Sequence, residues 1–109
     1  MFSLKETLAF HKQFCPFPLD FKLAEWLDKA GLSAHEDKRI STFSSGMLQR
    51  VRLLLAVAND RPLLLLDEPL SNLDTEGVQF YSELIRSFAL SKTIIVGSNY
   101  QKDEYSYCT

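Results

Sequence analysis

Apolar positions in the first half of the chain recur at the spacing of helices. They predict a helix over residues 4–14 and a second over 23–30, with Asp20 as a candidate N-cap and Gly31 as the stop. A third helix is predicted over residues 47–59, and it is apolar on almost every side, which indicates burial by several neighbours. The first half is therefore expected to be helical.

The second half has a different pattern. Four consecutive leucines at 63–66 predict a strand covered on both faces by helices, and residues 93–96 predict a second buried strand. Between them, residues 75–88 form an amphipathic helical pattern. Strand, helix and strand at this spacing predict a right-handed crossover with parallel strands. We expect an α/β chain with a helical subdomain over 1–60 and a βαβ unit over 61–109.

Composition narrows the function classes. The chain has 109 residues and a net charge of -2, so no overall basic charge favours nucleic acid as a partner. Cys15 and Cys108 lie far apart with no metal-ligand spacing around them, which is typical of free thiols in a reducing compartment. No apolar run approaches the roughly 20 residues that span a bilayer. We expect a cytoplasmic chain.

Aromatic and basic residues receive a structural interpretation. Phe10, Phe14, Phe21 and Trp26 fall within or beside the predicted amphipathic helices, so core packing explains them better than stacking on a nucleic-acid base. The basic pair Arg50 and Arg52, and the pair at 38–39, are interpreted as solvated faces.

Two acids follow the leucine strand, at the edge of a sheet where α/β proteins bind ligands. Asp67 is a candidate ligand for Mg²⁺, an ion that takes one or two carboxylates together with phosphate oxygens. Glu68 is a candidate general base that would polarise a water molecule. The alternative is a core strand that ends in an acidic, solvated turn.

A loop of small residues opens the third predicted helix. Ser44, Ser45 and Gly46 would leave backbone N–H groups at the positive end of the helix dipole, which suits a phosphate. The alternative is that the serines cap the first turn of the helix.

Five segments together resemble the ATPase domain of ATP-binding cassette (ABC) transporters. The stretch 43–50, Phe-Ser-Ser-Gly-Met-Leu-Gln-Arg, resembles the signature motif, and 67–69, Asp-Glu-Pro, the end of Walker B. The stretch 71–74, Ser-Asn-Leu-Asp, resembles the D-loop, and 93–98 the strand before the switch residue. Residues 4–8 are similar to the start of the helical subdomain. The resemblance implies part of a P-loop NTPase fold.

In that family two ATPase domains pair head to tail around ATP and Mg²⁺ and work on a membrane permease subunit. The resemblance implies that Ser44, Ser45 and Gly46 contact the γ-phosphate held by the second domain, with Gln49 close behind. It further implies Asp67 for Mg²⁺, Glu68 as the base, and Asp74 as a bridge between the two sites. The permease would hold the protein at the inner face of the membrane.

The sequence departs from the family pattern at several places. Ser45 and Met47 replace the usual glycine and glutamine of the signature, and Asn99 stands where the switch histidine is expected. Asparagine can still donate a hydrogen bond to a phosphate, but it carries no charge at neutral pH. We therefore assign Asn99 a modified catalytic role.

The larger departure is that no glycine is followed by Lys and Ser or Thr, so the 109 residues contain neither a Walker A loop nor a Q-loop. We expect a truncated domain that is inactive alone and that self-associates through an exposed apolar sheet edge. Transport is the leading function. The alternatives are an ABC-type ATPase that is not coupled to transport, working on DNA or the ribosome, and a non-catalytic module that offers its signature loop to a partner's ATP.

Overall fold

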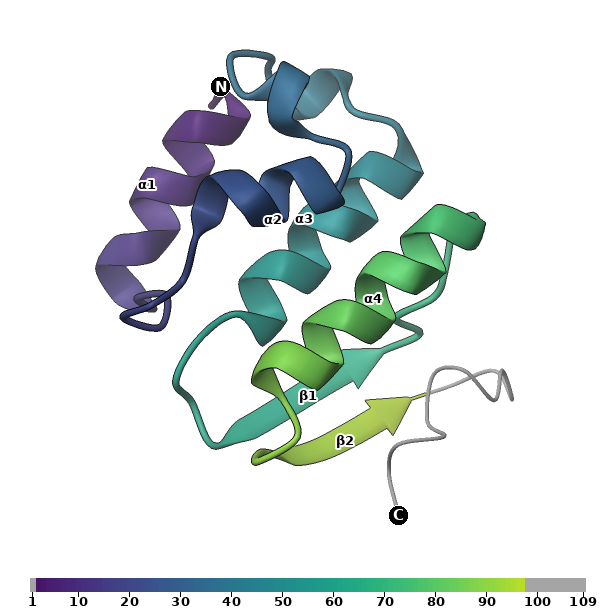
Figure 1. Cartoon of the computed structure of the whole chain (residues 1–109). Coiled ribbons are helices and arrows are strands. Elements are labelled where there is room, and N and C mark those ends of the chain that lie inside the picture. The colour runs from purple at the N-terminus through teal and green to yellow at the C-terminus, as the bar shows by residue number, and fades with distance from the viewer. Residues whose placement is uncertain (1, 98–109) are drawn as a thin grey trace.

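The computed structural model describes residues 2–97, which form four α-helices, two short 3₁₀ turns and two strands (Figure 1). In chain order these are α1 (Leu4–Phe14), α2 (Leu23–Lys29), η1 (Ser33–His35), η2 (Ile40–Thr42), α3 (Ser45–Val57), β1 (Leu63–Asp67), α4 (Thr75–Phe88) and β2 (Thr93–Gly97).

The two strands are parallel, as predicted. Their register runs from Leu63 opposite Thr93 to Asp67 opposite Gly97, and α4 makes the crossover between them. Figure 1 shows α4 lying over the sheet, with α3 behind it and the helical first half beyond. The prediction of an α/β chain is confirmed.

The expectation that both sheet faces are covered is wrong. Along β1, Leu64 and Leu66 are buried, whereas Leu63 and Leu65 are 51% and 64% exposed. Ile95 of β2 is 55% exposed in the same way. An unbroken run of leucines is typical of a strand with two covered faces, but the described residues place helices on one face only. An apolar sheet face is therefore open.

The helix ends follow local capping chemistry. At the start of α1, the Ser3 hydroxyl accepts from the Glu6 N–H at 3.2 Å and the Glu6 carboxylate accepts from the Ser3 N–H at 3.0 Å. This capping box satisfies two N–H groups and lowers the pKa of Glu6. Gly31 has a φ of +72°, as expected of a residue that stops a helix.

Two predicted boundaries are corrected. Asp20 is not the N-cap of α2, because the Phe21 N–H bonds back to the Pro18 carbonyl and the helix begins only at Leu23. Helix α3 begins at Ser45, two residues earlier than predicted, because Ser44 caps it.

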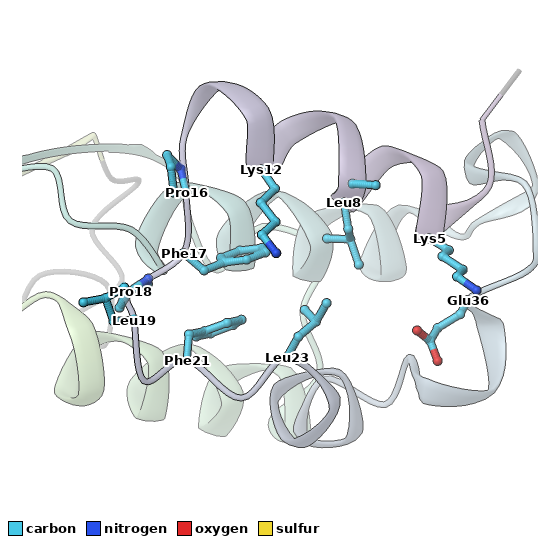
Figure 2. Close-up of a pocket in the computed structure, with 11 residues that line it drawn as sticks. Lys5, Leu8, Lys12, Pro16, Phe17, Pro18, Leu19, Phe21, Leu23 and Glu36 are labelled. Atoms are coloured by element: carbon cyan, nitrogen blue, oxygen red, sulfur yellow. The ribbon is translucent and has the colours of Figure 1, made fainter.

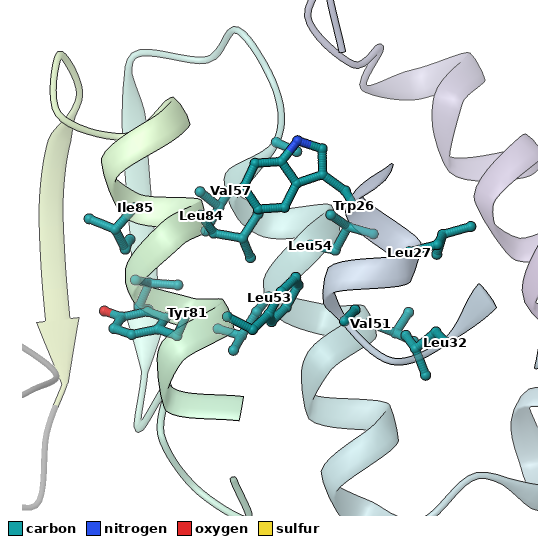
Figure 3. Packing of buried hydrophobic residues seen from close by; sticks show 14 of the residues in the cluster. Trp26, Leu27, Leu32, Val51, Leu53, Leu54, Val57, Tyr81, Leu84 and Ile85 are labelled. Atoms are coloured by element: carbon teal, nitrogen blue, oxygen red, sulfur yellow. The ribbon is translucent and has the colours of Figure 1, made fainter. Parts of the chain in front are cut away.

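The core is continuous from α2 through α3 to α4 (Figure 3). Leu54 of α3 is at its centre with no exposed surface, between Trp26 of α2 and Leu84 of α4. The predicted apolar face of α4 is confirmed, since Tyr81, Leu84 and Ile85 are all buried. The division of the chain into 1–60 and 61–109 stays a prediction. Helix α3, which belongs to the first part, packs on β1 and α4 of the second.

The aromatic residues divide into two groups. Trp26 is 6% exposed and packs against Phe88, with ring centroids 5.2 Å apart, and Phe21 is half-buried beside it. Phe10 and Phe14, however, are 54% and 64% exposed, so their assignment to the core is wrong. Their rings contact each other along one face of α1.

A buried polar side chain fixes the end of α3. Asn59 is 7% exposed, and its amide nitrogen donates to the Ala56 carbonyl at 2.9 Å. Its amide oxygen accepts from the Arg61 N–H and from Lys92 Nζ, both at 2.9 Å. Burial lowers the pKa of Lys92. The pair ties α3 to the start of β2.

Among the described residues no helix has the length and apolar character needed to cross a membrane.

Leu54→Ala should lower the free energy of unfolding by about 2–5 kcal/mol, because it removes a fully buried side chain at the centre of the core. Leu90→Ala is the matched control, since that leucine is 66% exposed and its loss should change stability by less than about 0.5 kcal/mol. Urea unfolding followed by circular dichroism measures both. Equal losses for the two variants would contradict the assigned core.

Candidate functional site

A shallow pocket of roughly 300 Å³ lies where the loop before α3 meets the loop before α4. It brings together four of the predicted site residues, Ser44, Ser45, Gly46 and Asp74, although the first and last of them are 30 positions apart in the sequence. Its lining consists of Ser44, Ser45, Gly46, Met47, Arg50, Asn72 and Asp74.

The N-terminus of α3 opens into this pocket. Ser44 is the N-cap, and its hydroxyl accepts from the Met47 N–H at 3.1 Å, so the capping interpretation holds for this residue. The first N–H groups of a helix have no partner within the helix. Those of Ser45 and Gly46 therefore remain for a ligand, at the positive end of the helix dipole. The loop can cap its helix and present donors at once.

Gly46 packs directly on the backbone of the loop before α4. A Cβ at this position would lie 2.9 Å from the Asn72 carbonyl oxygen, closer than carbon and oxygen pack. Asn72 itself has a φ of +63°, in the left-handed region that asparagine tolerates. Glycine at 46 is thus required by the approach of two loops, which the sequence pattern alone does not reveal.

Arg50 joins three elements, and its assignment to a solvated face is wrong. Its side chain is 18% exposed. One terminal nitrogen donates to Asp74 Oδ1 at 2.8 Å, and the other to the Ala30 carbonyl at the end of α2 at 3.1 Å. The guanidinium can hold both partners because its donors are fixed in a plane.

Asp74 caps α4. The same Oδ1 that meets Arg50 also accepts from the Gly77 N–H at 2.8 Å. This backbone hydrogen bond is the main reason that the pKa of Asp74 lies below its usual value, and Arg50 lowers it further. The capping role was missed in the sequence, although an aspartate directly before an amphipathic helix is a recognised N-cap signal. Its role across an interface stays a prediction.

Asp67 and Glu68 lie at the end of β1, outside the pocket lining. Asp67 is exposed, and its Oδ1 lies 3.0 Å from where a Cβ on Gly97 would stand. Glu68 is half-buried with a φ of +44°, and its N–H donates to the Gly97 carbonyl at 2.6 Å. The backbone turns sharply here, directly after the strand.

Gln49 connects this turn to α3. Its amide nitrogen donates to the Pro69 carbonyl at 3.0 Å and approaches the Glu68 carbonyl at 3.5 Å. The side-chain nitrogen is thereby directed to the turn that carries Glu68, away from the pocket lining. Asn99, the remaining predicted site residue, lies outside the described residues.

Comparison with known proteins identifies the family. A family model described as ABC transporter matches residues 3–71, more than half of the chain. The chain belongs to the ABC transporter family.

Curated members of the ABC family align over most of the chain. The cytochrome c biogenesis ATP-binding export protein CcmA of Vibrio cholerae is 34% identical over 99 residues, which are 91% of this chain and 46% of that protein. An uncharacterised ABC transporter ATP-binding protein of Nostoc is 39% identical over 90 residues, which are 80% of this chain and 27% of that protein. The chain thus spans less than half the length of these relatives.

Solved structures show the fold. A putative cobalt transport ATP-binding protein is similar with a TM-score of 0.76 at 21% identity, over 96% of this chain and 39% of that one. The RNase-L inhibitor is similar with a TM-score of 0.72 at 25% identity, over 96% of this chain and 20% of that one. The described elements therefore have the P-loop NTPase arrangement of ABC ATPase domains, as the sequence predicted.

Gly46→Ala should destabilise the chain by about 1–3 kcal/mol, because the added methyl group would overlap the Asn72 carbonyl. The sign of this stability change tests the contact, since alanine would otherwise stabilise a helix relative to glycine by up to about 1 kcal/mol. Ser45→Ala is the control, because Ser45 is exposed and does not cap the helix. A stabilising Gly46→Ala in urea unfolding would refute the close packing of the two loops.

Asp74→Asn should lose a stabilisation that depends on pH. Because the folded-state pKa is lowered, the ionised carboxylate stabilises the fold above its unfolded pKa, and this contribution disappears as the pH falls through the folded pKa. The melting temperatures of wild type and Asp74→Asn should thus differ most at neutral pH and converge as the pH falls below the usual pKa of an aspartate. Asp20→Asn, in an exposed turn, is the control. A difference that stays constant with pH would argue against the Asp74 contacts.

Proposed function

We propose that the chain is the signature-bearing part of the ATP-hydrolysing subunit of a membrane transporter. Membership of the ABC family supports this, as do relatives described as ATP-binding proteins of export and lantibiotic transport systems. The observation that carries the proposal is the single pocket shared by the signature loop and the D-loop. Because the chain spans less than half of its relatives, we assign hydrolysis to the whole protein.

The signature loop would contact the γ-phosphate of ATP held by a second ATPase domain paired head to tail with this one. The N–H groups of Ser45 and Gly46 and the hydroxyls of the two serines are suited to this, because they are hydrogen-bond donors at a helix N-terminus. Asp74, which also lines the pocket, would contact the second domain and so bridge the two ATP sites.

Asp67 and Glu68 would serve the ATP of this domain. Bound Mg²⁺ neutralises developing charge on the phosphates, and Asp67 would support the ion from the end of β1. Mg²⁺ takes most of its ligands from phosphate and water, so one or two carboxylates of the protein are enough for it. Glu68 would accept the proton of the attacking water, and Asn99 would donate a hydrogen bond to the γ-phosphate.

A groove in the helical subdomain is suited to a permease subunit (Figure 2). The groove of roughly 570 Å³ lies between α1 and residues 16–23, with Leu8, Phe17 and Phe21 among its apolar lining. Lys5 and Lys12, two turns apart on α1, also line it, together with one acid, Glu36. We assign to it an amphipathic cytoplasmic helix of the permease whose acidic residues would meet these lysines. This contact would hold the protein at the inner face of the membrane.

Titration with Mg-ATP should shift the backbone amide NMR signals of Ser45 and Gly46, because their N–H groups would bind phosphate. Ser45→Asp, at an exposed position, should abolish the shift of the Gly46 signal through charge repulsion, whereas the control Leu90→Asp, in the exposed turn after α4, should not. The chain alone should not turn over ATP. Unperturbed Ser45 and Gly46 signals at millimolar Mg-ATP would contradict the signature role. ATP turnover by the chain alone that is abolished by Glu68→Gln would contradict the claim that hydrolysis requires a Walker A loop, which these 109 residues lack.

The chain should self-associate through the uncovered face of its sheet, because Leu63, Leu65 and Ile95 are exposed there. Leu65→Lys should shift the chain towards monomer, as measured by light scattering after size exclusion across a range of concentrations. Leu19→Lys is the control, because that side chain is fully exposed in a loop away from the sheet. A wild-type chain that stays monomeric at high concentration would refute this contact.

A further inference from the structure

The backbone of Glu68 has a conformation that side chains rarely allow. Its φ of +44° lies in the left-handed region, which residues with a Cβ seldom occupy. Glu68 also directly precedes Pro69, and a residue before proline favours extended backbone. Such a conformation persists only where the surrounding contacts hold it. The contacts around this turn therefore set the point from which the Glu68 side chain leaves the backbone.

Backbone hydrogen bonds hold the turn over residues 68–71. The Glu68 N–H donates to the Gly97 carbonyl at 2.6 Å, and the Ser71 N–H donates to the Glu68 carbonyl at 3.0 Å. Between them, Pro69 is fully buried. A carbonyl that is withdrawn from water requires a hydrogen-bond donor from the protein, so the middle of the turn depends on a neighbouring element.

Gln49 of α3 supplies a donor to this carbonyl. Its Nε2 donates to the Pro69 carbonyl at 3.0 Å and lies 3.5 Å from the Glu68 carbonyl. The Gln49 side chain is half-buried and is not part of the signature pocket lining. One amide group thus meets two successive carbonyls of the turn, from a helix position 19 residues before Glu68.

We propose that Gln49 is a positioning residue for hydrolysis, whose amide nitrogen holds the turn so that the Glu68 carboxylate can reach the attacking water. The inference rests on the proposed function of Glu68 as the general base and adds a second residue to that role. A base must lie within hydrogen-bond reach of the proton that it accepts. A displacement of about 1 Å can slow a reaction by about 100-fold.

The first test measures the Glu68 backbone in the 109-residue chain by NMR. The cross-peak between the amide proton and Hα of one residue is strong where φ is positive, because the two protons approach each other. Gln49→Met keeps the length of the side chain but removes its donor, so this cross-peak should be lost for Glu68. Gln13→Met, at an exposed position of α1, is the matched control and should preserve it. A Glu68 cross-peak that Gln49→Met leaves intact would overturn the inference.

A charge variant separates the donated hydrogen bond from packing. Gln49→Glu has nearly the same shape, but at neutral pH its carboxylate has no proton to donate to the two carbonyls. The facing carbonyl oxygens should raise the pKa of the introduced carboxyl above the usual value of about 4.3. The Glu68 cross-peak should therefore be absent at neutral pH and return as the pH falls through that pKa, with wild type at the same pH as the reference. Equal signals above and below that pKa would overturn the role of the donated bond.

Kinetics of the whole ATPase distinguish this inference from the proposed function. Gln49→Met should lower kcat by about 10- to 100-fold and change the KM for ATP by less than about twofold, because it displaces the base and not the nucleotide. Gln13→Met should change neither. Unchanged kcat in Gln49→Met, together with loss of turnover in Glu68→Gln, would overturn the positioning role and leave the base intact. Full turnover in Glu68→Gln would refute the base itself.

Discussion

The guanidinium of Arg50 holds together the parts of the chain from which the candidate site is built. It bonds the carboxylate of Asp74 and the carbonyl of Ala30 from a position one turn into α3. The end of α2, the signature loop and the D-loop therefore share one side chain. The Arg50 side chain is largely withdrawn from water, whereas Asp74 is 66% exposed, so the pair joins the interior of the site to its surface.

Helix α3 is the common support of the site. Its first turn presents the signature serines, Gly46 packs on the D-loop backbone, and Gln49 holds the turn after β1 that carries Glu68. At its other end Asn59 and Lys92 tie it to β2. A displacement of α3 would thus move the signature loop, the D-loop and the Walker B turn together. Under the proposed function, this one helix would connect residues that act on two different nucleotides in a pair of ATPase domains.

The sequence predicted those parts of the fold that depend on local pattern. The bounds of α4 were correct at both ends, because its apolar spacing is regular, and the parallel pair followed from chain connectivity. Burial was less predictable. Four leucines cannot reveal that one sheet face lacks a helix among the described residues, and the spacing of Phe10 and Phe14 could not distinguish a core stripe from an exposed one.

The site was predicted by motif and corrected by geometry. Ser44, Ser45, Gly46 and Asp74 do line one pocket, but the partners that position them come from long-range contacts. The ion pair of Arg50 spans 24 residues, and the contact of Gly46 with Asn72 spans 26. No periodicity encodes such pairs. The catalytic and metal-binding roles of Glu68 and Asp67 remain predictions from the family resemblance.

A double-mutant cycle of Arg50→Gln and Asp74→Asn tests most directly whether these loops form one unit. Unfolding in urea at neutral pH would be measured for wild type, both single variants and the double variant. The contact predicts that Arg50→Gln costs clearly less stability in the Asp74→Asn background than in wild type, because the ion pair is already lost there. An equal cost of Arg50→Gln in both backgrounds would show that Arg50 and Asp74 act independently and would contradict this account.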